Sequence, residues 1–325
     1  MSKILSICIP TYNMGEYLDI NLKGIIKLSS KLDLNNKIEI CISDNNSTDD
    51  TETIVRKYID KNIDIKYHKN QDNIGADKNF LKSVEISSGK FSWIMGADDI
   101  LLEEVLIDIL DLIKLNKYDI LLGDRLNIDL SGKEKYIQHW AKEETIVTNK
   151  NYSEFIDSSY RVGAVFSYIS SIIFKKDRWD EEIEKLDIKR FIGTCYIHSL
   201  ILISMIKNNS KMLYTHKAMV KNRVGNDSFL SEGYFNRLKI DFNYLDIFEY
   251  LFKKESKEYK SMRLLLNKER TFLHFLKAKY LVSKNREMKK EFETFLKVMK
   301  IQNRSLINSI PNIFIEILLK LYIKR

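Results

Sequence analysis

Residues 38–49 read IEICISDNNSTD and decide the fold class of this 325-residue chain. Ile38–Ile42 is a short apolar run, which is typical of a strand buried on both faces of a parallel sheet. Residues 43–49 are polar and rich in the side chains that begin helices, so a helix is expected from about Asp50. Strand, polar loop and helix together form the repeating unit of an α/β sheet.

The same unit recurs on both sides of this stretch. Four further strands are expected at Ile4–Ile9, Ile63–His68, Phe91–Met95 and Tyr118–Leu122, and helices at about 16–30, 76–87 and 102–115. Each polar cluster falls at the carboxyl end of a strand, the edge at which open α/β sheets bind ligands. We therefore predict an α/β fold with a mostly parallel central sheet flanked by helices.

Beyond Gly123 the pattern becomes less regular. A hairpin arm is expected at 126–132, strands at 168–174 and 212–220, a helix at 195–206, and almost purely helical structure from Phe235 onward. We predict one domain over residues 1–235 and a helical C-terminal extension over residues 236–325.

The charge is divided unevenly along the chain. The net charge is +8, but residues 251–325 alone hold 19 Lys and Arg against 7 Asp and Glu, a net charge of +12. The first 250 residues are slightly acidic, which argues against a nucleic-acid surface over that part. Residues 310–325 are amphipathic with basic flanks, as in helices that lie on an anionic membrane. Over residues 236–300 a solvated Lys face on packed helices is an equal alternative.

The cysteines and the apolar runs bear on the compartment. Cys8, Cys41 and Cys195 are odd in number and far apart, which favours a reducing cytoplasm over a disulfide framework. The apolar stretch that starts at Ile4 ends too early for a signal peptide, and no run approaches the ~20 apolar residues of a membrane span.

Paired carboxylates form the strongest of four polar clusters at successive strand ends. Asp98 and Asp99 follow a strand directly, and Gly96 and Ala97 leave room for close approach. Such a pair suits a divalent cation shared with substrate phosphates. The alternative is that one of the two carboxylates only caps the next helix.

The other three clusters are weaker when taken singly. Asp44 could accept hydrogen bonds from a nucleobase, or it could belong to a capping loop. Tyr12 could stack on a base, although a turn containing proline after a strand is common. Asn73 and Asn79 flank the turn at Gly75 beside the same edge of the sheet.

In combination and order, the four clusters resemble glycosyltransferase family 2, the nucleotide-sugar transferases with the GT-A fold. The family pattern of P-T-Y-N, D-x-x-S-T-D, N-x-G-x-x-x-N, G-x-[FY] and D-D-I is present here at residues 10–13, 44–49, 73–79, 89–91 and 98–100. The match covers about residues 3–125. The sequence around Asp44 and Asp98 looks most like the abequosyltransferase-type branch, which acts on bacterial surface polysaccharides.

The resemblance implies a role for each matching residue. Pro10, Thr11 and Tyr12 would line the nucleotide pocket, Asp44 would bind the base, Asn73, Gly75 and Asn79 would shape the ribose and phosphate side, and Asp98 and Asp99 would hold Mg²⁺ or Mn²⁺, with Asp99 the more direct ligand. The cation would stabilise charge on the departing nucleoside diphosphate. Residues 1–125 would form the nucleotide-sugar-binding half and residues 126–235 the acceptor-binding half.

Two positions depart from the family pattern near the chemistry. Gly96 stands where the family motif D-x-D-D has its first Asp. The Glu-Asp pair that usually begins a helix 90–110 residues later is replaced by residues 191–198, FIGTCYIH. His198 is the nearest titratable group there, so it is the candidate general base alongside Asp98 as a catalytic carboxylate. A packed core histidine is the alternative.

A later family feature, R-x-H-x-x-S, is altered at residues 223–228. Arg223 is retained and could meet the diphosphate. Gly225 stands at the usual metal-binding His, and Asn226 could compensate.

The sequence thus predicts a metal-dependent hexosyl- or deoxyhexosyltransferase. It would extend a lipid-linked or cell-surface glycan of polysaccharide, O-antigen or capsule type. It would work at the cytoplasmic face of the cell membrane, with peripheral contact through its C-terminal helices, and a second copy of the chain is a further candidate partner. One alternative is a sugar nucleotidyltransferase, which would need a Gly-rich phosphate loop after the first strand. The other is a non-catalytic membrane-associated scaffold that retains the fold.

Overall fold

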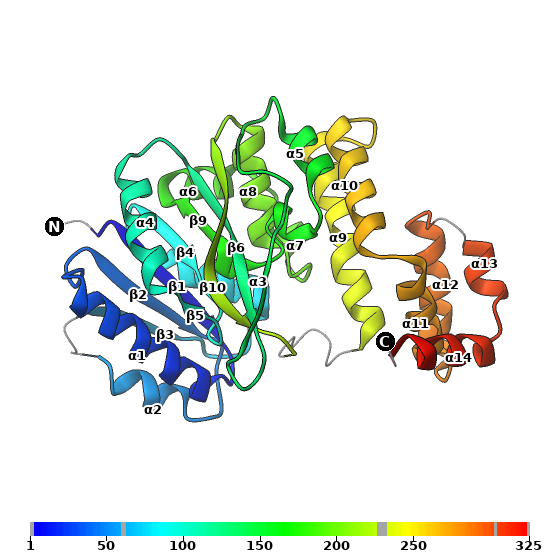
Figure 1. The fold of residues 1–325 in the computed structure, drawn as a ribbon, viewed down its shortest axis with the longest axis horizontal. Coiled ribbons are helices and arrows are strands. Elements are labelled where there is room, and N and C mark those ends of the chain that lie inside the picture. Colours follow the sequence, from blue (N-terminus) through cyan, green and yellow to red (C-terminus); the bar gives the residue numbers. More distant parts are fainter. Residues whose placement is uncertain (1–2, 60–62, 226–232, 302–303, 324–325) are drawn as a thin grey trace. The chain divides into compact units, whose positions relative to one another are not determined.

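A computed structural model describes residues 3–59, 63–225, 233–301 and 304–323 (Figure 1). The chain divides into two compact units, residues 1–225 and residues 226–325. The first unit is a sheet covered by helices, and the described part of the second is helical.

Among the described residues, one ten-stranded sheet organises the first unit. Its strands are β1 (Leu5–Thr11), β2 (Ile38–Asp44), β3 (Asp64–Lys69), β4 (Phe91–Ile94), β5 (Ile100–Leu101), β6 (Ile120–Ile128), β7 (Glu134–Gln138), β8 (Thr145–Val147), β9 (Ile172–Lys175) and β10 (Met212–Arg223). Their order is β3-β2-β1-β4-β9-β6-β10-β5, with β7 paired to β6 and β8 paired to β10.

The two halves of the sheet differ in strand direction. Strands β1 to β4 are all parallel, as the regular first part of the sequence predicts. Strand β9 then lies antiparallel between β4 and β6, and β10 runs parallel to β6. The predicted GT-A type architecture of a central sheet flanked by helices is confirmed, with its antiparallel pairs gathered in the second half.

Helices cover this sheet. They are α1 (Gly15–Lys31), α2 (Thr51–Arg56), α3 (Ala76–Glu85), α4 (Glu103–Lys114), α5 (Tyr152–Ser158), α6 (Lys176–Lys185), α7 (Ile188–Phe191) and α8 (Ile197–Lys207), with short 3₁₀ turns at Val162–Val165 and Ile169–Ser171. In α1, Leu18, Leu22 and Ile25 recur at helical spacing and are fully buried against the sheet. Burial of each such side chain contributes about 1.5–3 kcal/mol.

The described part of the second unit contains α9 (Tyr234–Phe252), α10 (Lys257–Glu269), α11 (Phe272–Val282), α12 (Arg286–Val298), α13 (Arg304–Ser309) and α14 (Asn312–Ile323). Edge-to-face contacts of Phe235 and Phe242 with Phe295 join α9 to α12. Within the described residues, no helix is long and apolar enough to span a membrane.

Candidate active site

The loops that follow β1 and β2 are locked together. Parallel pairing sets Thr11 opposite Asp44, and the N–H of Asn45 donates to the carbonyl of Thr11 (2.9 Å). Further along the two loops, the N–H of Asn13 donates to Oγ of Ser47 (2.9 Å). The first two predicted clusters therefore form one rigid edge.

Asp44 is fully buried in this edge and has a donor on each carboxylate oxygen. The N–H of Ser47 donates to Oδ1 (2.8 Å), and the hydroxyl of Tyr67 donates to Oδ2 (2.7 Å). Burial, and then the carboxylate of Asp44, raise the pKa of Tyr67, so the phenol stays a donor. The carboxylate is fixed in orientation, and each oxygen keeps a lone pair that a base could use.

Asn79 ties α3 to the ends of both strands. Its Oδ1 accepts from Oγ of Ser43 (2.7 Å) and Nδ2 of Asn70 (3.1 Å), and its Nδ2 donates to the carbonyl of Ser43 (3.0 Å). Because its amide is buried and bonded on both sides, Asn79 holds the start of α3 against the end of β2.

Asn73 and Gly75 form the turn that begins α3. Oδ1 of Asn73 accepts from Nδ2 of Asn45 (2.8 Å) and from the N–H of Gly75 (3.0 Å). Gly75 has φ +81° and ψ 162°, a backbone conformation that is essentially restricted to glycine. Both residues are exposed, so they line the edge of the site.

The β1 loop presents one large side chain to a ligand. Pro10 and Thr11 are buried, and Oγ1 of Thr11 has no partner among the described residues. Tyr12 is 45% exposed. The predicted stacking residue is thus accessible, whereas Pro10 and Thr11 form the floor beneath it.

Asp98 and Asp99 lie in a tight turn after β4, the neighbour of β1. Oγ of Ser170 accepts from the N–H of Gly96 (2.8 Å) and donates to Oδ2 of Asp99 (2.5 Å). Nδ2 of Asn21, on α1, donates to the carbonyl of Gly96 (3.3 Å). The paired carboxylates therefore stand at the same edge of the sheet as Tyr12 and Asp44.

Asp99 is a buried carboxylate in an unfavourable setting. It is 4% exposed, and burial together with the charge of Asp98 raises its pKa to about 7, against the opposing effects of Ser170 and Arg125. A carboxylate of this kind is stabilised by a bound cation, which lowers the cost of its charge.

Gly96 stands where the family motif has its first Asp. A Cβ at this position would lie 2.8 Å from Oδ2 of Asp99 and 3.1 Å from Oδ1 of Asp98. Both carboxylates fold back over residue 96 and occupy the space that a side chain would need. A side chain at residue 96 would therefore displace these two carboxylate groups from the positions they have here.

Arg125 and Tyr168 are site residues that the sequence pattern does not reveal. The guanidinium of Arg125 stacks over the rings of Tyr168 (4.5 Å) and Trp140 (5.2 Å), and its charge acts on Asp99. Tyr168 is half-buried beside Asp99, and burial followed by the charge of Asp99 raises its pKa. These residues and Ser170 come from the irregular part of the chain, where no motif marks them.

Arg223 lies at the end of β10 and contacts α1. Its guanidinium is over the ring of Tyr17, on α1, at 5.5 Å. Gly225 is exposed with φ +99°, so a histidine there would be strained. Asn226, the suggested compensating residue, lies outside the described residues.

His198 does not have the geometry of a general base. It is buried on α8, and its Nε2 donates to the carbonyl of Phe166 (2.8 Å). Burial lowers its pKa to about 4, with the bond to Phe166 acting in the opposite direction. We therefore do not propose His198 as the general base, because its ring is buried and its Nε2 is hydrogen-bonded to the carbonyl of Phe166.

The same bond shows what His198 does structurally. Phe166 has φ +72°, which is strained for a bulky residue, and its carbonyl also accepts from Oγ of Ser199 (3.2 Å). Two residues later the chain reaches Tyr168, and then Ser170 at the Asp99 turn. His198 thus fixes the segment from Phe166 to Ser170, which places Ser170 beside Asp99.

An acidic residue does reach the helix start where the family pair is missing. The carboxylate of Asp77, from α3, accepts from the N–H groups of Gly193 (2.7 Å), Cys195 (2.9 Å) and Ile197 (3.1 Å) at the beginning of α8. Burial raises the pKa of Asp77, and these bonds oppose the rise. Asp77 anchors α8 to the nucleotide side of the site.

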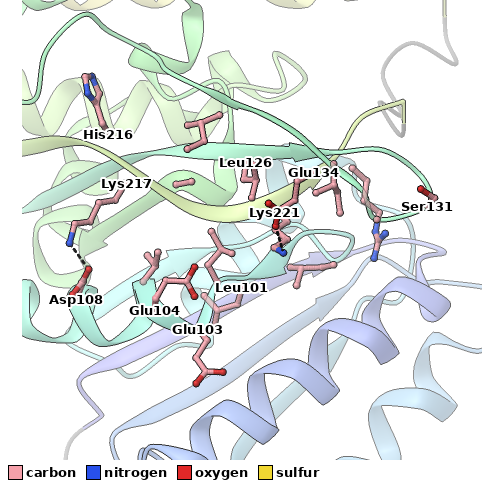
Figure 2. A pocket seen from close by; sticks show the side chains of 18 residues that line it. Leu101, Glu103, Glu104, Asp108, Leu126, Ser131, Glu134, His216, Lys217 and Lys221 are labelled. Carbon is pink, nitrogen blue, oxygen red and sulfur yellow. Dashed lines mark hydrogen bonds and ion pairs between the residues drawn. The ribbon is translucent and has the colours of Figure 1, made fainter.

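A groove of about 960 Å³ begins at Ile100, directly after the Asp98-Asp99 turn (Figure 2). Its walls come from β5, α4, β6, β7 and β10, and they carry charges of both signs. Lys217 is ion-paired with Asp108, and Lys221 is paired with Glu134 (2.8 Å). Arg223 lines the same groove.

Comparison with known proteins identifies the family of this chain. The family model of glycosyl transferase family 2 matches residues 6–177. The abequosyltransferase RfbV of Salmonella typhimurium is 37% identical over 281 residues, which cover 83% of this chain and 82% of that relative. The chain belongs to glycosyl transferase family 2. As a family 2 glycosyltransferase it is an enzyme, which decides against the nucleotidyltransferase and scaffold alternatives.

Solved structures show the same fold in other glycosyltransferases. TarS residues 1–349 of S. aureus, in complex with UDP-GlcNAc, gives a TM-score of 0.67 at 18% identity and covers 91% of this chain and 80% of that chain. The mannosyltransferase PcManGT of Pyrobaculum calidifontis, in complex with GDP-Man and Mn²⁺, gives 0.53 at 12% identity over 94% and 83%. At these identities the similarity establishes the GT-A fold.

Proposed function

We propose that this family 2 enzyme transfers a hexosyl or deoxyhexosyl group from a nucleoside-diphosphate sugar to a lipid-linked or cell-surface glycan, with the help of Mg²⁺ or Mn²⁺. The observation that carries the proposal is the Asp98-Asp99 turn, which brings a buried carboxylate and its neighbour to the edge of the sheet beside the β1 loop. The similarity to an abequosyltransferase favours a deoxyhexose and a bacterial surface glycan such as O-antigen.

The residues at this turn fit a divalent cation. Asp98 and Asp99 supply oxygen ligands, which Mg²⁺ and Mn²⁺ prefer, and the raised pKa of Asp99 marks a carboxylate that a cation would stabilise. When bound, the cation would neutralise charge on the departing nucleoside diphosphate.

The remaining roles follow from position and exposure. Tyr12 offers its ring to the base, and Asp44 offers fixed acceptor oxygens behind it. The charge of Arg125 acts on Asp99, and Arg223 lines the groove that begins at Ile100, so a diphosphate at this turn would gain charge-assisted hydrogen bonds from them. Together they would orient the donor and hold the leaving group.

The acceptor would approach along the groove that follows Asp99. Residues 126–223 supply much of its wall, in agreement with the role expected of the acceptor-binding half. Its mixed charges suit hydroxyl-rich and amide-bearing sugars. On α14, Ile313, Phe314 and Ile317 are exposed on one stripe, which supports peripheral contact with the cytoplasmic face of a membrane that carries the acceptor.

The experiment is a donor screen with purified full-length protein. Nucleoside diphosphates and their sugars are tested for thermal stabilisation with and without Mn²⁺, and slow hydrolysis of each stabilising sugar donor is then followed. We expect one nucleotide class to stabilise the protein in a Mn²⁺-dependent way and its sugar to be hydrolysed.

Asp111→Asn is the matched control, since Asp111 is an exposed carboxylate on α4 away from the turn. It should behave as the unaltered enzyme, whereas Asp99→Asn should lose the Mn²⁺ dependence. Stabilisation by nucleotide that is equal in the presence and absence of Mn²⁺ would contradict the proposed role of the carboxylates.

A further inference from the structure

A second cluster of metal-ligand side chains lies outside the Asp98-Asp99 turn. Asp124 on β6, His139 after β7 and His216 on β10 each offer one ligand atom, and these atoms lie within 4.8 Å of one another. Oδ2 of Asp124 is 2.5 Å from Nδ1 of His139, and the rings of the two histidines are 4.7 Å apart. Three separate strands or loops thus converge on one point.

The carboxylate in this cluster is buried and oriented. The hydroxyl of Tyr214 (2.8 Å) and the N–H of Trp140 (3.1 Å) both donate to Oδ1 of Asp124. Oδ2 is left facing the histidines. Metal-binding carboxylates are commonly held in this way by a second layer of hydrogen bonds.

His216 is oriented by a similar bond. Its Nε2 is 3.2 Å from the carbonyl of Ala141, to which it can donate, and this fixes the proton on that nitrogen and leaves a lone pair on Nδ1. Histidine ligands of metals characteristically donate their other N–H to a carbonyl or a carboxylate. The carboxylate of Glu144 also accepts from the backbone N–H of His216 (2.8 Å), which adds negative charge nearby.

The nearby cations are directed elsewhere. Lys217 lies on the opposite side of β10 from His216, where it is paired with Asp108 (Figure 2). Arg125 follows Asp124 on β6, and its guanidinium lies over Tyr168, beside Asp99. Because successive strand residues point to opposite faces, Asp124 and Arg125 serve two different sites.

We propose that Asp124, His139 and His216 bind a zinc ion. Two imidazoles and one carboxylate suit Zn²⁺ and related transition metals, whereas the all-oxygen turn at Asp98 and Asp99 suits Mg²⁺ or Mn²⁺. The ion fastens residues 139–141 to β6 and β10, on the strand that also carries Arg125. The inference is independent of the proposed donor and acceptor.

The test is a Zn²⁺ titration of chelator-stripped, full-length protein in millimolar Mg²⁺, which occupies oxygen-only sites. We expect one equivalent of Zn²⁺ to bind and to raise the melting temperature. Loss of an outer-shell partner costs about tenfold to 100-fold in metal affinity, so loss of a ligand itself in His139→Ala or His216→Ala should weaken binding by at least about 100-fold. His68→Ala, on β3 at the far side of the sheet order, is the matched control and should bind as the unaltered protein does.

A spectroscopic variant keeps the test decisive if an alanine variant folds poorly. His139 is half-exposed, and in His139→Cys a Co²⁺ probe should gain a thiolate-to-cobalt charge-transfer band that the unaltered protein lacks. Equal Zn²⁺ affinity in the unaltered protein and in the His139→Ala/His216→Ala double variant, or no such band in the folded cysteine variant, would overturn the proposal.

Discussion

Asp44 and Asp99 are both buried carboxylates at the ends of strands that flank β1, yet their surroundings differ. Asp44 has a hydrogen-bond donor on each oxygen, and its neighbours Tyr67 and Ser47 are neutral. Asp99 has the carboxylate of Asp98 beside it and a pKa raised to about 7. A carboxylate bonded only to neutral donors is suited to position a ligand, whereas two adjacent carboxylates that repel each other are suited to a cation. We therefore assign recognition of the donor to Asp44 and binding of the cation to Asp98 and Asp99, at the same edge of the sheet.

The largest expected effect comes from Asp99→Asn. The variant keeps the shape of the turn but removes a charge that a cation needs, so transfer should fall by about 10³-fold, since metal stabilisation amounts to several kcal/mol. Turnover with saturating donor and Mn²⁺ measures it. Retention of full activity would remove the metal assignment.

The same variant should not destabilise the fold. The pKa of Asp99 is about 7 in the folded protein and lies above its unfolded value, so the folded state binds more protons between about pH 4 and 7. The group therefore reduces stability as pH rises through that window. Asp99→Asn should remove this dependence, with a gain of up to about 4 kcal/mol at pH 7. Denaturation at pH 5 and pH 8 without metal tests the sign.

Gly96→Ala should disturb the paired carboxylates without removing either one. The added Cβ would meet Oδ2 of Asp99 at 2.8 Å, so the carboxylate must shift and turnover should fall by about 10²-fold. Gly24→Ala on α1 is the control, because its Cβ would meet nothing and should stabilise the helix by about 0.5–1 kcal/mol. Normal Mn²⁺ binding by Gly96→Ala would show that the turn tolerates a side chain.

Asp44→Asn should affect donor binding more than turnover. It replaces an oxygen acceptor with an amide donor opposite Tyr67 or Ser47, which costs about 1–3 kcal/mol of stability and raises the KM of the donor. Tyr67→Phe removes only one bond to Asp44 and should cost about 1 kcal/mol. A fall in kcat with unchanged KM in Asp44→Asn would place Asp44 with the chemistry.

The smallest effect on turnover is expected at His198. His198→Gln keeps a donor for the carbonyl of Phe166, so turnover should fall only severalfold and the shape of its pH profile should not change. Loss of a true general base would cost about 10²–10⁴-fold and remove a limb of the profile. The pH dependence of kcat in the variant separates the two roles.

The sequence predicts the first half of the sheet and its edge because both depend on local patterns. Apolar runs followed by polar loops locate β1, β2 and β4, and the parallel pairing brings Asp44 beside the β1 loop. Strand β9 overlaps the strand expected at 168–174, but its place in the sheet is not predictable in this way. It is four residues long, preceded by a 3₁₀ turn, and its antiparallel place between β4 and β6 is decided by contacts distant in the sequence.

The same limit applies to the site. Ser170, which precedes β9, and Arg125, on β6, come close to Asp99 only in the folded sheet. No sequence motif near Asp99 therefore identifies them. His198 is chosen from the sequence for its chemistry, but burial decides its role, and burial depends on tertiary packing around Phe166.

If Asp98 and Asp99 hold a divalent cation that the nucleoside diphosphate needs, nucleotide binding must depend on both the cation and Asp99. The most direct measurement is calorimetric binding of the stabilising nucleoside diphosphate to the unaltered protein and to Asp99→Asn, each with and without Mn²⁺. We expect Mn²⁺ to strengthen binding to the unaltered protein by tenfold or more, at about 1.4 kcal/mol per tenfold, and to have no effect on Asp99→Asn. An equal Mn²⁺ effect in both proteins would contradict this expectation.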